Sequence, residues 1–338
     1  MRKFFLSLIM VLVASVFMGK VFAQSSTLAT LNHEGTISTF YGATAWKQAH
    51  DAAVNGDVIT LSSGNFVAVN ITKAITVRGA GMVLDTTAGI EPTVITGDFE
   101  INIADAGSCR LTLEGIYSNH KIIYYNAVNP LFLKCRMKEI SGAYSYSVLK
   151  DASFIHCRIV DGLSLSINCS ASCVNSVIQD PTSVNSSTSN FEFTNCYLRG
   201  TMSYVWSSIF KNCIISDNTD YYQMSSSCNA YNCIVLTFSN NYFTNIPNTT
   251  NKSLTDYTAF FKTYTGDELD KLDSETFELT DEAKTKYLGN DGTEVGIYGG
   301  ILPFDPTPTN PQITKCNVAA KSTADGKLSV DIEVRAAE

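Results

Sequence analysis

The feature that most constrains the fold is a short pattern that recurs about every twenty residues in the middle of the chain. Each copy centres on a small residue, usually cysteine, with asparagine before it in most copies and an aliphatic residue two positions later. The central residues are Cys135, Cys157, Ser176, Cys196, Cys213 and Cys233. Self-similarity at this period, with loose spacing, is typical of a solenoid in which every copy adds one coil.

The copies lack helical periodicity, so they predict a β-solenoid. In a strand, the central position and the position two residues later lie on the same face, which should point inward. Phenylalanine three positions before the centre breaks this alternation and places a bend at the intervening asparagine. Asparagine tolerates left-handed backbone, and its amide can bond along a stack of turns. We therefore expect the cysteines to be interior residues stacked about 4.8 Å apart.

Ten cysteines in one chain raise the question of disulfide bonds. Side chains in register keep their Cβ atoms about 4.8 Å apart, beyond the roughly 3.5–4.5 Å that a disulfide needs. Ser176 also interrupts the row. We predict free stacked thiols, with Cys169 and Cys173 as the better candidates for a pair. The scattered histidines and the cysteines lack the spacing of a metal site.

A different pattern precedes the repeats. Trp46, Ala49 and Ala53 fall on one face of a predicted short helix, which should cover the open end of the solenoid. The motifs that follow are Gly56-Asp57-x-Ile59-x-Leu61, Gly64-x-Phe66, Ile75-Thr-Val77-x-Gly79 and Leu111-Thr-Leu113-Glu-Gly115. They resemble the N-terminal cap and first coils of right-handed parallel β-helix proteins, the pectin-lyase-like group. Residues 290–300, "NDGTEVGIYGG", resemble the closing segment of many bacterial secreted β-helix proteins.

The predicted fold class is all-β: a right-handed parallel β-helix of about ten or more coils, with an N-terminal capping helix and a small C-terminal β tail. Residues 1–23 have the basic start, apolar run and small-residue end of a secretory signal peptide. The β-helix is expected over residues 24–303, a Pro-rich linker over 304–311 and a β-hairpin tail over 312–338, turning at Asp325-Gly326. The tail is too small to bury a core alone and should dock on the β-helix or on a partner.

The expected export of the protein and its net negative charge limit the kinds of partner that it can bind. Removal of residues 1–23 removes three basic residues and no acidic ones, so the formal net charge goes from −8 to about −11. Such a chain lacks the clustered positive charge that binding to nucleic acid or to an anionic membrane requires. No later apolar run is long enough for a membrane span. We expect a soluble monomer that is secreted to the extracellular space or the cell surface, or retained in the periplasm.

A row of acids follows the central positions by four residues. Glu139, Asp161 and Asp180 would stand about 5 Å apart on consecutive coils, and neighbours would repel by roughly 3 kcal/mol at an effective dielectric constant of about 20. The row must therefore face solvent, share protons or hold a cation such as calcium. The arrangement resembles that of pectate lyases, which implies calcium on these acids and Arg199 as the base. The alternative is that the acids are ordinary turn residues.

Two further groups could contact a ligand. Arg136, Arg158, Lys138 and Arg199 occupy outward positions and form a basic strip that could bind uronates or sulfated sugars, or that could simply neutralise the acids. Aromatic residues recur eight to eleven positions after the centre and could stack on sugar rings if exposed, or pack inside the other sheets. These are Tyr144, Tyr146, Tyr204, Trp206, Tyr221, Tyr222, Tyr242 and Phe243.

Three functions are compatible with these patterns, because the pectin-lyase-like fold hosts lyases, hydrolases, esterases and non-catalytic adhesins. The leading hypothesis is a secreted or cell-surface protein that binds a polysaccharide or glycan along the solenoid face without catalysis. The ligand-binding candidates are Arg136, Arg158, Tyr144, Tyr204, Trp206, Tyr221 and Tyr222. The alternatives are a calcium-dependent polysaccharide lyase and a structural adhesin that binds protein partners. The motifs of polygalacturonases are missing, which weighs against a glycoside hydrolase.

Overall fold

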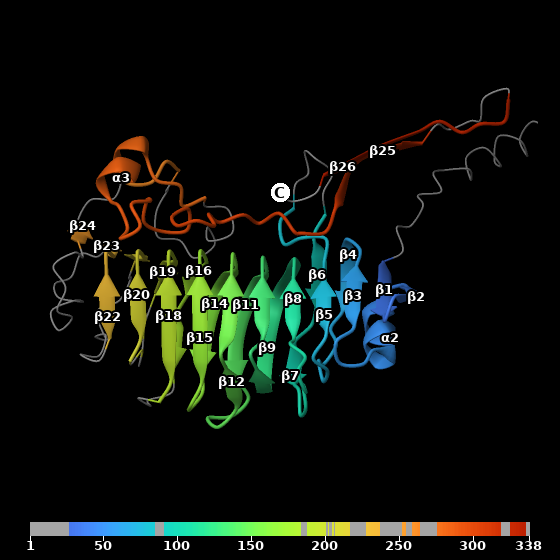
Figure 1. The fold of residues 1–338 in the computed structure, drawn as a ribbon, viewed down its shortest axis with the longest axis horizontal. Helices are drawn as coiled ribbons and strands as arrows, with labels where there is room; N and C mark the ends of the chain where they lie inside the picture. The colour runs from blue at the N-terminus through green and yellow to red at the C-terminus, as the bar shows by residue number, and fades with distance from the viewer. Residues whose placement is uncertain are drawn as a thin grey trace, which may run out of the picture.

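The protein forms a parallel β-solenoid of about eight turns, which confirms the predicted all-β right-handed β-helix. Figure 1 shows the strands of successive turns standing side by side along the long axis. The computed structural model describes residues 27–84, 91–183, 188–200, 202, 205, 207–216, 228–236, 252–254, 259–263, 276–318 and 325–335.

One face of the solenoid, sheet A, is a ladder of short parallel strands closed at its N-terminal edge by an antiparallel hairpin. In ladder order the strands are β2 (Thr36–Tyr41), β1 (Leu28–His33), β3 (Val58–Leu61), β5 (Thr76–Arg78), β8 (Thr112–Glu114), β10 (Leu131–Leu133), β13 (Ala152–Ile155), β15 (Ser170–Val174), β18 (Asn190–Thr194), β20 (Ile209–Lys211) and β22 (Asn229–Tyr231).

The second face, sheet B, follows the same turns with parallel strands. In ladder order these are β4 (Gly64–Val67), β6 (Thr93–Thr96), β9 (Ile116–Val128), β11 (Arg136–Gly142), β14 (Arg158–Leu165), β16 (Val177–Gln179), β19 (Tyr197–Arg199), β21 (Ile214–Ser216), β23 (Ile234–Leu236) and β24 (Lys252–Leu254). β7 (Phe99–Asn102) and β12 (Val148–Lys150) also pair with β9, and β17 (Pro181–Ser183) pairs with β14.

The repeat sets the register of the core as predicted. All six central residues, from Cys135 to Cys233, are fully buried, and the backbone hydrogen bonds between β11, β14, β16, β19, β21 and β23 keep them in register. The residues three positions earlier also align from turn to turn, so that Phe132 stacks on Phe154 with ring centroids 4.7 Å apart. The cysteines are therefore packing residues of the core.

The nine described cysteines are all free. The proposed pairing of Cys169 with Cys173 is therefore wrong. The two residues lie four apart along one extended segment at β15, which separates their Cα atoms by about 13 Å, whereas a disulfide needs about 4–7 Å.

The bend between the two sheets lies at the predicted asparagines. Asn175, Asn195, Asn212 and Asn232 have φ angles of 45°, 52°, 54° and 54°, which is the left-handed region. Lys134 and His156 occupy the same corner of earlier turns with φ of 52° each. Corners of this kind let a strand of sheet A pass directly into a strand of sheet B without a long loop.

The N-terminal end is capped in two ways. The helix α2 (Ala45–Ala52) buries Trp46 and Ala49 against the first turn, as predicted, and the Trp46 ring packs edge-on against Phe99 at 5.9 Å. The β1–β2 hairpin, which sequence analysis missed, adds antiparallel strands to the edge of sheet A. Together they cover the pairing groups that an open solenoid end would expose.

The C-terminal part of the chain returns along the outside of the solenoid. After α3 (Asp281–Lys286), residues 287–309 run back past the ends of the sheet B strands toward the N-terminal turns (Figure 1). We call residues 287–309 the strap. Residues at or next to the corners of six turns bond to it, in the pairs Glu114 with Thr309, Lys134 with Asp305, His156 with Leu302, Asn175 with Gly299, Asn212 with Asn290, and Asn232 with Leu288.

The amides of Asn175, Asn212 and Asn232 thus bond to the strap, and the expectation that asparagine amides bond along the stack of turns is not met. Asn175 is the clearest case, because its Nδ2 donates to the carbonyl oxygens of Ile297 and Gly299, each at 2.8 Å. The corner points the side chain outward, where the carbonyls of the strap are the nearest acceptors.

Beyond the strap, β25 (Gln312–Val318) and β26 (Val330–Arg335) form the predicted antiparallel hairpin. Figure 1 shows this hairpin projecting away from the strands of the solenoid. Its apolar residues are about half exposed, so the solenoid does not cover them; they are Leu328, Val330, Ile332 and Val334. Docking of the tail on a partner stays a prediction.

Candidate functional site

The outer face of sheet B is the side on which ligand contacts were expected, and the protein's own chain covers the C-terminal half of it. Outward residues such as Tyr197 and Ile214 pack against Phe261, Phe277 and Leu279. The Tyr197 ring stacks on Phe277 with centroids 4.1 Å apart. A ligand would therefore meet sheet B at the earlier turns, where β9, β11 and β14 stand beside the strap.

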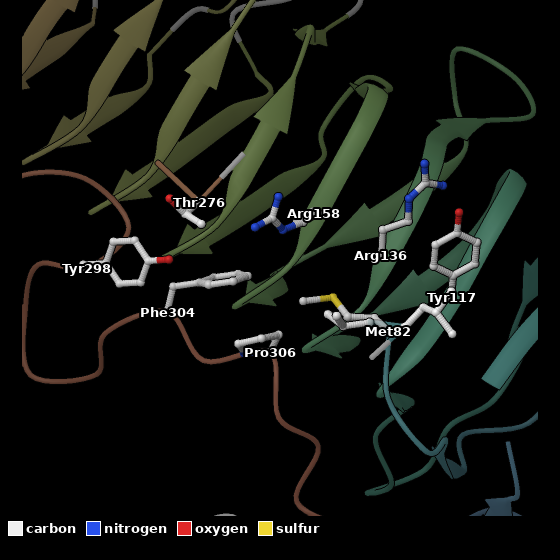
Figure 2. Close-up of a pocket in the computed structure, with 10 residues that line it drawn as sticks. Met82, Tyr117, Arg136, Arg158, Thr276, Tyr298, Phe304 and Pro306 are labelled. Carbon is white, nitrogen blue, oxygen red and sulfur yellow. The ribbon is translucent and has the colours of Figure 1, made fainter. Parts of the chain in front are cut away.

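A cavity of about 440 Å³ opens at that place. We call it the arginine pocket. Figure 2 shows its two arginines extending from neighbouring strands in different directions, with Phe304 of the strap beside Arg158 and Tyr117 beside Arg136. Its lining residues are Met82, Val83, Leu84, Tyr117, Arg136, Arg158, Thr276, Tyr298, Phe304 and Pro306.

The two arginines are neighbours because they occupy the same position of consecutive turns. Arg136 on β11 is paired in register with Arg158 on β14, one position after Cys135 and Cys157 respectively. Alternation along the strand turns the cysteines inward and the arginines outward. Their backbones are neighbours in the ladder, but the side chains diverge: Arg136 extends over Tyr117, and Arg158 extends toward Phe304 of the strap.

Local contacts fix both guanidinium groups. Arg136 is only 6% exposed, and its Nη1 donates to the carbonyl oxygen of Ser118 at 2.9 Å and to Asn119 Oδ1. Arg136 is therefore part of the buried wall, and the less buried Arg158 is the guanidinium that a ligand can reach. Its Cζ lies 4.7 Å from the centre of the Tyr117 ring. Arg158 lies 5.2 Å from the ring centre of Phe304. Held arginines lose little conformational entropy when they bind a planar carboxylate or a sulfate.

The remaining walls are aromatic or apolar. Tyr117 sits beside Arg136, and Phe304 approaches Arg158 from the strap. Burial raises the pKa of Tyr298, while the charge of Arg158 acts in the opposite direction, so this phenol stays neutral and can donate a hydrogen bond. The pocket thus combines fixed positive charge with flat apolar surfaces.

Sequence analysis found the two arginines of this pocket but missed its other walls. Tyr117 pairs in register with Arg136, so extending the repeat one turn earlier would have identified it. Phe304, Pro306 and Tyr298 come from the strap, and nothing in their local sequence links them to the repeat.

The acids do not form the expected row. Glu139 is paired with Gly162, because the register between β11 and β14 shifts just before it, and so it does not stand beside Asp161. Two of the three acids lie beside a lysine: Lys121 Nζ lies 2.7 Å from Glu139 Oε1, and Lys138 Nζ lies 3.8 Å from Asp161 Oδ2. This geometry favours the reading in which basic residues neutralise neighbouring acids.

Arg199 and Asp180 lie farther along sheet B. Arg199 is 3% exposed, and a base that acts on a polysaccharide needs access to it. Asp180 Oδ2 accepts from Gln179 Nε2 at 3.0 Å, and the Asp180 carboxylate leaves no room for a Cβ at Gly200. Calcium at Glu139, Asp161 and Asp180 stays an untested prediction, and their placement lends it no support.

Of the aromatic candidates, Tyr144 lies after β11 and away from the arginine pocket, where it is 53% exposed. The other predicted ligand-binding aromatics fall outside the described residues; these are Tyr204, Trp206, Tyr221 and Tyr222, together with Tyr242 and Phe243. Residues 1–26, with the expected signal peptide, also fall outside them.

Within the described ranges, no group of three or more His, Cys, Asp and Glu side chains is placed to hold a metal ion. No helix in the same part of the chain combines the length and apolar character that crossing a bilayer requires. Comparison of the chain with protein-family models, curated proteins and solved structures found no match. The fold itself is established, and a function must be inferred from the pocket.

Proposed function

We propose that the protein is an exported, non-catalytic binding protein for acidic polysaccharides, and that it holds a uronate or sulfate group in the arginine pocket. The observation that carries this proposal is the alignment of Arg136 and Arg158 on consecutive turns at the rim of one cavity. Guanidinium groups bind carboxylates and sulfates through paired hydrogen bonds, which supply orientation as well as charge attraction.

The size and shape of the pocket favour a ligand whose negative group is attached to a sugar ring. A volume of about 440 Å³ is in the range of small-ligand sites and accommodates one or two sugar rings. Tyr117 and Phe304 offer flat surfaces for the C–H face of a ring. A solenoid also repeats its surface every turn, which suits a ligand that is itself a repeating polymer.

Two sequence features agree with this role. The expected signal peptide would place the protein outside the cytoplasm, where acidic polysaccharides occur. The resemblance of the early coils to pectin-lyase-like proteins points to a fold that often handles such polymers. The absence of catalysis is proposed because Arg199 is buried and Glu139 is out of line with Asp161.

Affinity electrophoresis of the purified protein tests the proposal, with polygalacturonate, alginate and chondroitin sulfate each cast in a native gel. We expect retardation by at least one of them. Replacement of Arg158 by alanine should weaken binding about 10- to 100-fold, since a hydrogen-bonded charge contributes roughly 1.5–3 kcal/mol. Arg158→Lys should recover only part of this, because lysine lacks the planar fork.

Lys150→Ala is the matched control, because it removes an exposed positive charge from the end of β12 without touching the pocket. Equal losses in Lys150→Ala and Arg158→Ala would show non-specific charge attraction and refute the pocket. Incubation with polygalacturonate and calcium, followed by ultraviolet absorbance of unsaturated products, tests for a lyase. Product formation that depends on Arg199 would overturn the non-catalytic assignment.

A further inference from the structure

Three tyrosines form an exposed aromatic surface near the far end of the long strand β9. Tyr144 and Tyr146 are 53% and 72% exposed, and their rings stack with centroids 5.1 Å apart and planes 9° apart. Tyr125 on β9 packs edge-on against Tyr144 at 5.8 Å. We call these three residues the tyrosine platform. It lies eight residues farther along β9 than Tyr117, and none of its residues lines the arginine pocket.

The turn that carries the platform is held rigidly. Ser166 Oγ donates to the carbonyl oxygen of Tyr144 at 2.8 Å, and the backbone N–H of Ser147 donates to the same oxygen at 3.0 Å. The N–H of Tyr144 in turn donates to Ser147 Oγ at 3.0 Å. At Gly142, Ser166 Oγ occupies the space that a Cβ would need. The backbone of this turn is therefore fixed before any ligand arrives, which lowers the entropy cost of binding.

Folding alone does not account for this exposure. A tyrosine ring offers about 150–250 Å² of surface, and leaving two such rings in water forgoes favourable burial. The polar neighbour of the platform is Glu100, whose carboxylate accepts from Tyr125 Oη at 3.4 Å and from Asn70 Nδ2 at 3.3 Å. A flat aromatic surface with a carboxylate at its edge matches a ligand that has an apolar face and hydroxyl groups around its rim.

We propose that the tyrosine platform is a second binding site, for an uncharged pyranose unit of a neutral polysaccharide. The C–H face of one sugar ring packs on the exposed face of Tyr146, and hydroxyls of another unit of the same polymer donate to Glu100 at the Tyr125 side of the platform. The charge of Glu100 disfavours a uronate or a sulfate here. This site does not depend on the arginine pocket, which takes the opposite class of ligand.

Native affinity gels that contain a soluble β-glucan, a galactan or a mannan test this site in the full-length protein. At least one of these neutral polymers should retard the protein. Tyr146→Ala should weaken that binding about tenfold, as expected for the loss of one aromatic stacking partner. Tyr146→Phe should retain most of it, because the ring face makes the contact. Tyr41→Ala is the matched control, since Tyr41 is 65% exposed on the distant β2 strand.

The two sites can fail separately. Arg158→Ala should leave binding to the neutral polymer unchanged, and Tyr146→Ala should leave binding to the acidic polymer unchanged. The platform proposal is overturned if no neutral polymer retards the protein, or if Tyr146→Ala and Tyr41→Ala bind alike. It is also overturned if sedimentation shows self-association that Tyr146→Ala abolishes, because the platform would then be a contact between protein copies.

Discussion

Replacement of Asn175 tests how the strap is attached to the solenoid. The side chain is 1% exposed, and its amide donates two hydrogen bonds of 2.8 Å to the strap carbonyls of Ile297 and Gly299. The residue also holds left-handed backbone, with φ of 45°. Asn175→Ala removes both hydrogen bonds. It also places alanine in left-handed backbone, which alanine tolerates less well than asparagine.

The expected loss follows from these two contributions. Two buried hydrogen bonds at about 1–1.5 kcal/mol each amount to roughly 2–3 kcal/mol, and left-handed strain at alanine adds about 1 kcal/mol. Asn175→Gly should lose only the hydrogen-bond part, because glycine adopts positive φ without strain. Asn129→Ala is the control, because Asn129 is exposed at φ 53° and its loss should be limited to about 1 kcal/mol of strain.

Hydrogen exchange resolves where the stability is lost. The N–H of Gly296 donates to the carbonyl of Asn212, and the N–H of Gly299 donates to the carbonyl of Gly296, so both report on the opening of the strap. In Asn175→Gly these amides should exchange about 30- to 150-fold faster, which corresponds to roughly 2–3 kcal/mol. Unchanged strap exchange, or an equal effect in Asn129→Ala, would refute the role assigned to the asparagine amide.

Further predictions concern the core and the strap. Phe193→Ala should reduce the free energy of unfolding by about 3–5 kcal/mol in urea titrations, because Phe193 is fully buried in the phenylalanine stack; a loss below about 1 kcal/mol would contradict that packing. Burial lowers the pKa of His156 from its ordinary 6.5, aided by Lys134 and opposed by its bond to Leu302 and by Asp305. The unfolded chain therefore binds the proton more readily, so stability falls as the pH drops below about 6.5. His156→Gln should reduce the pH dependence of the melting temperature, and an unchanged dependence would contradict this role of His156. Burial raises the pKa of Cys135 to about 12, so the native protein should resist alkylation there, as mass spectrometry would show; rapid labelling would contradict the buried row.

The repeat made the core predictable because its constraint is local and periodic. A small residue at Cys157, an aliphatic residue at Ile159 and a phenylalanine at Phe154 can all point inward only if the chain bends at His156. Each coil repeats this requirement, so a single alignment on the cysteines sets the register of the whole ladder. Outward positions follow from the same alternation, which is why Arg136 and Arg158 could be identified as neighbours.

The parts of the fold and of the arginine pocket that could not be predicted depend on contacts between segments far apart in the sequence. The hydrogen bonds of the strap to Asn175 and Lys134 join residues more than a hundred positions apart in the sequence. No periodic pattern in the sequence predicts such bonds. The register shift before Glu139 is a local irregularity of β11, and it was enough to take this acid out of line with Asp161. Strict extrapolation of the repeat therefore succeeded in the interior and at Arg136 and Arg158, and it failed beyond the register shift at Glu139.

A crystal structure of the protein with a bound acidic oligosaccharide tests the proposed function most directly. The account predicts a carboxylate or sulfate group within hydrogen-bonding distance of Arg158, with a sugar ring against Tyr117 or Phe304. An oligosaccharide bound elsewhere on the solenoid, with the arginine pocket free of sugar, would contradict it.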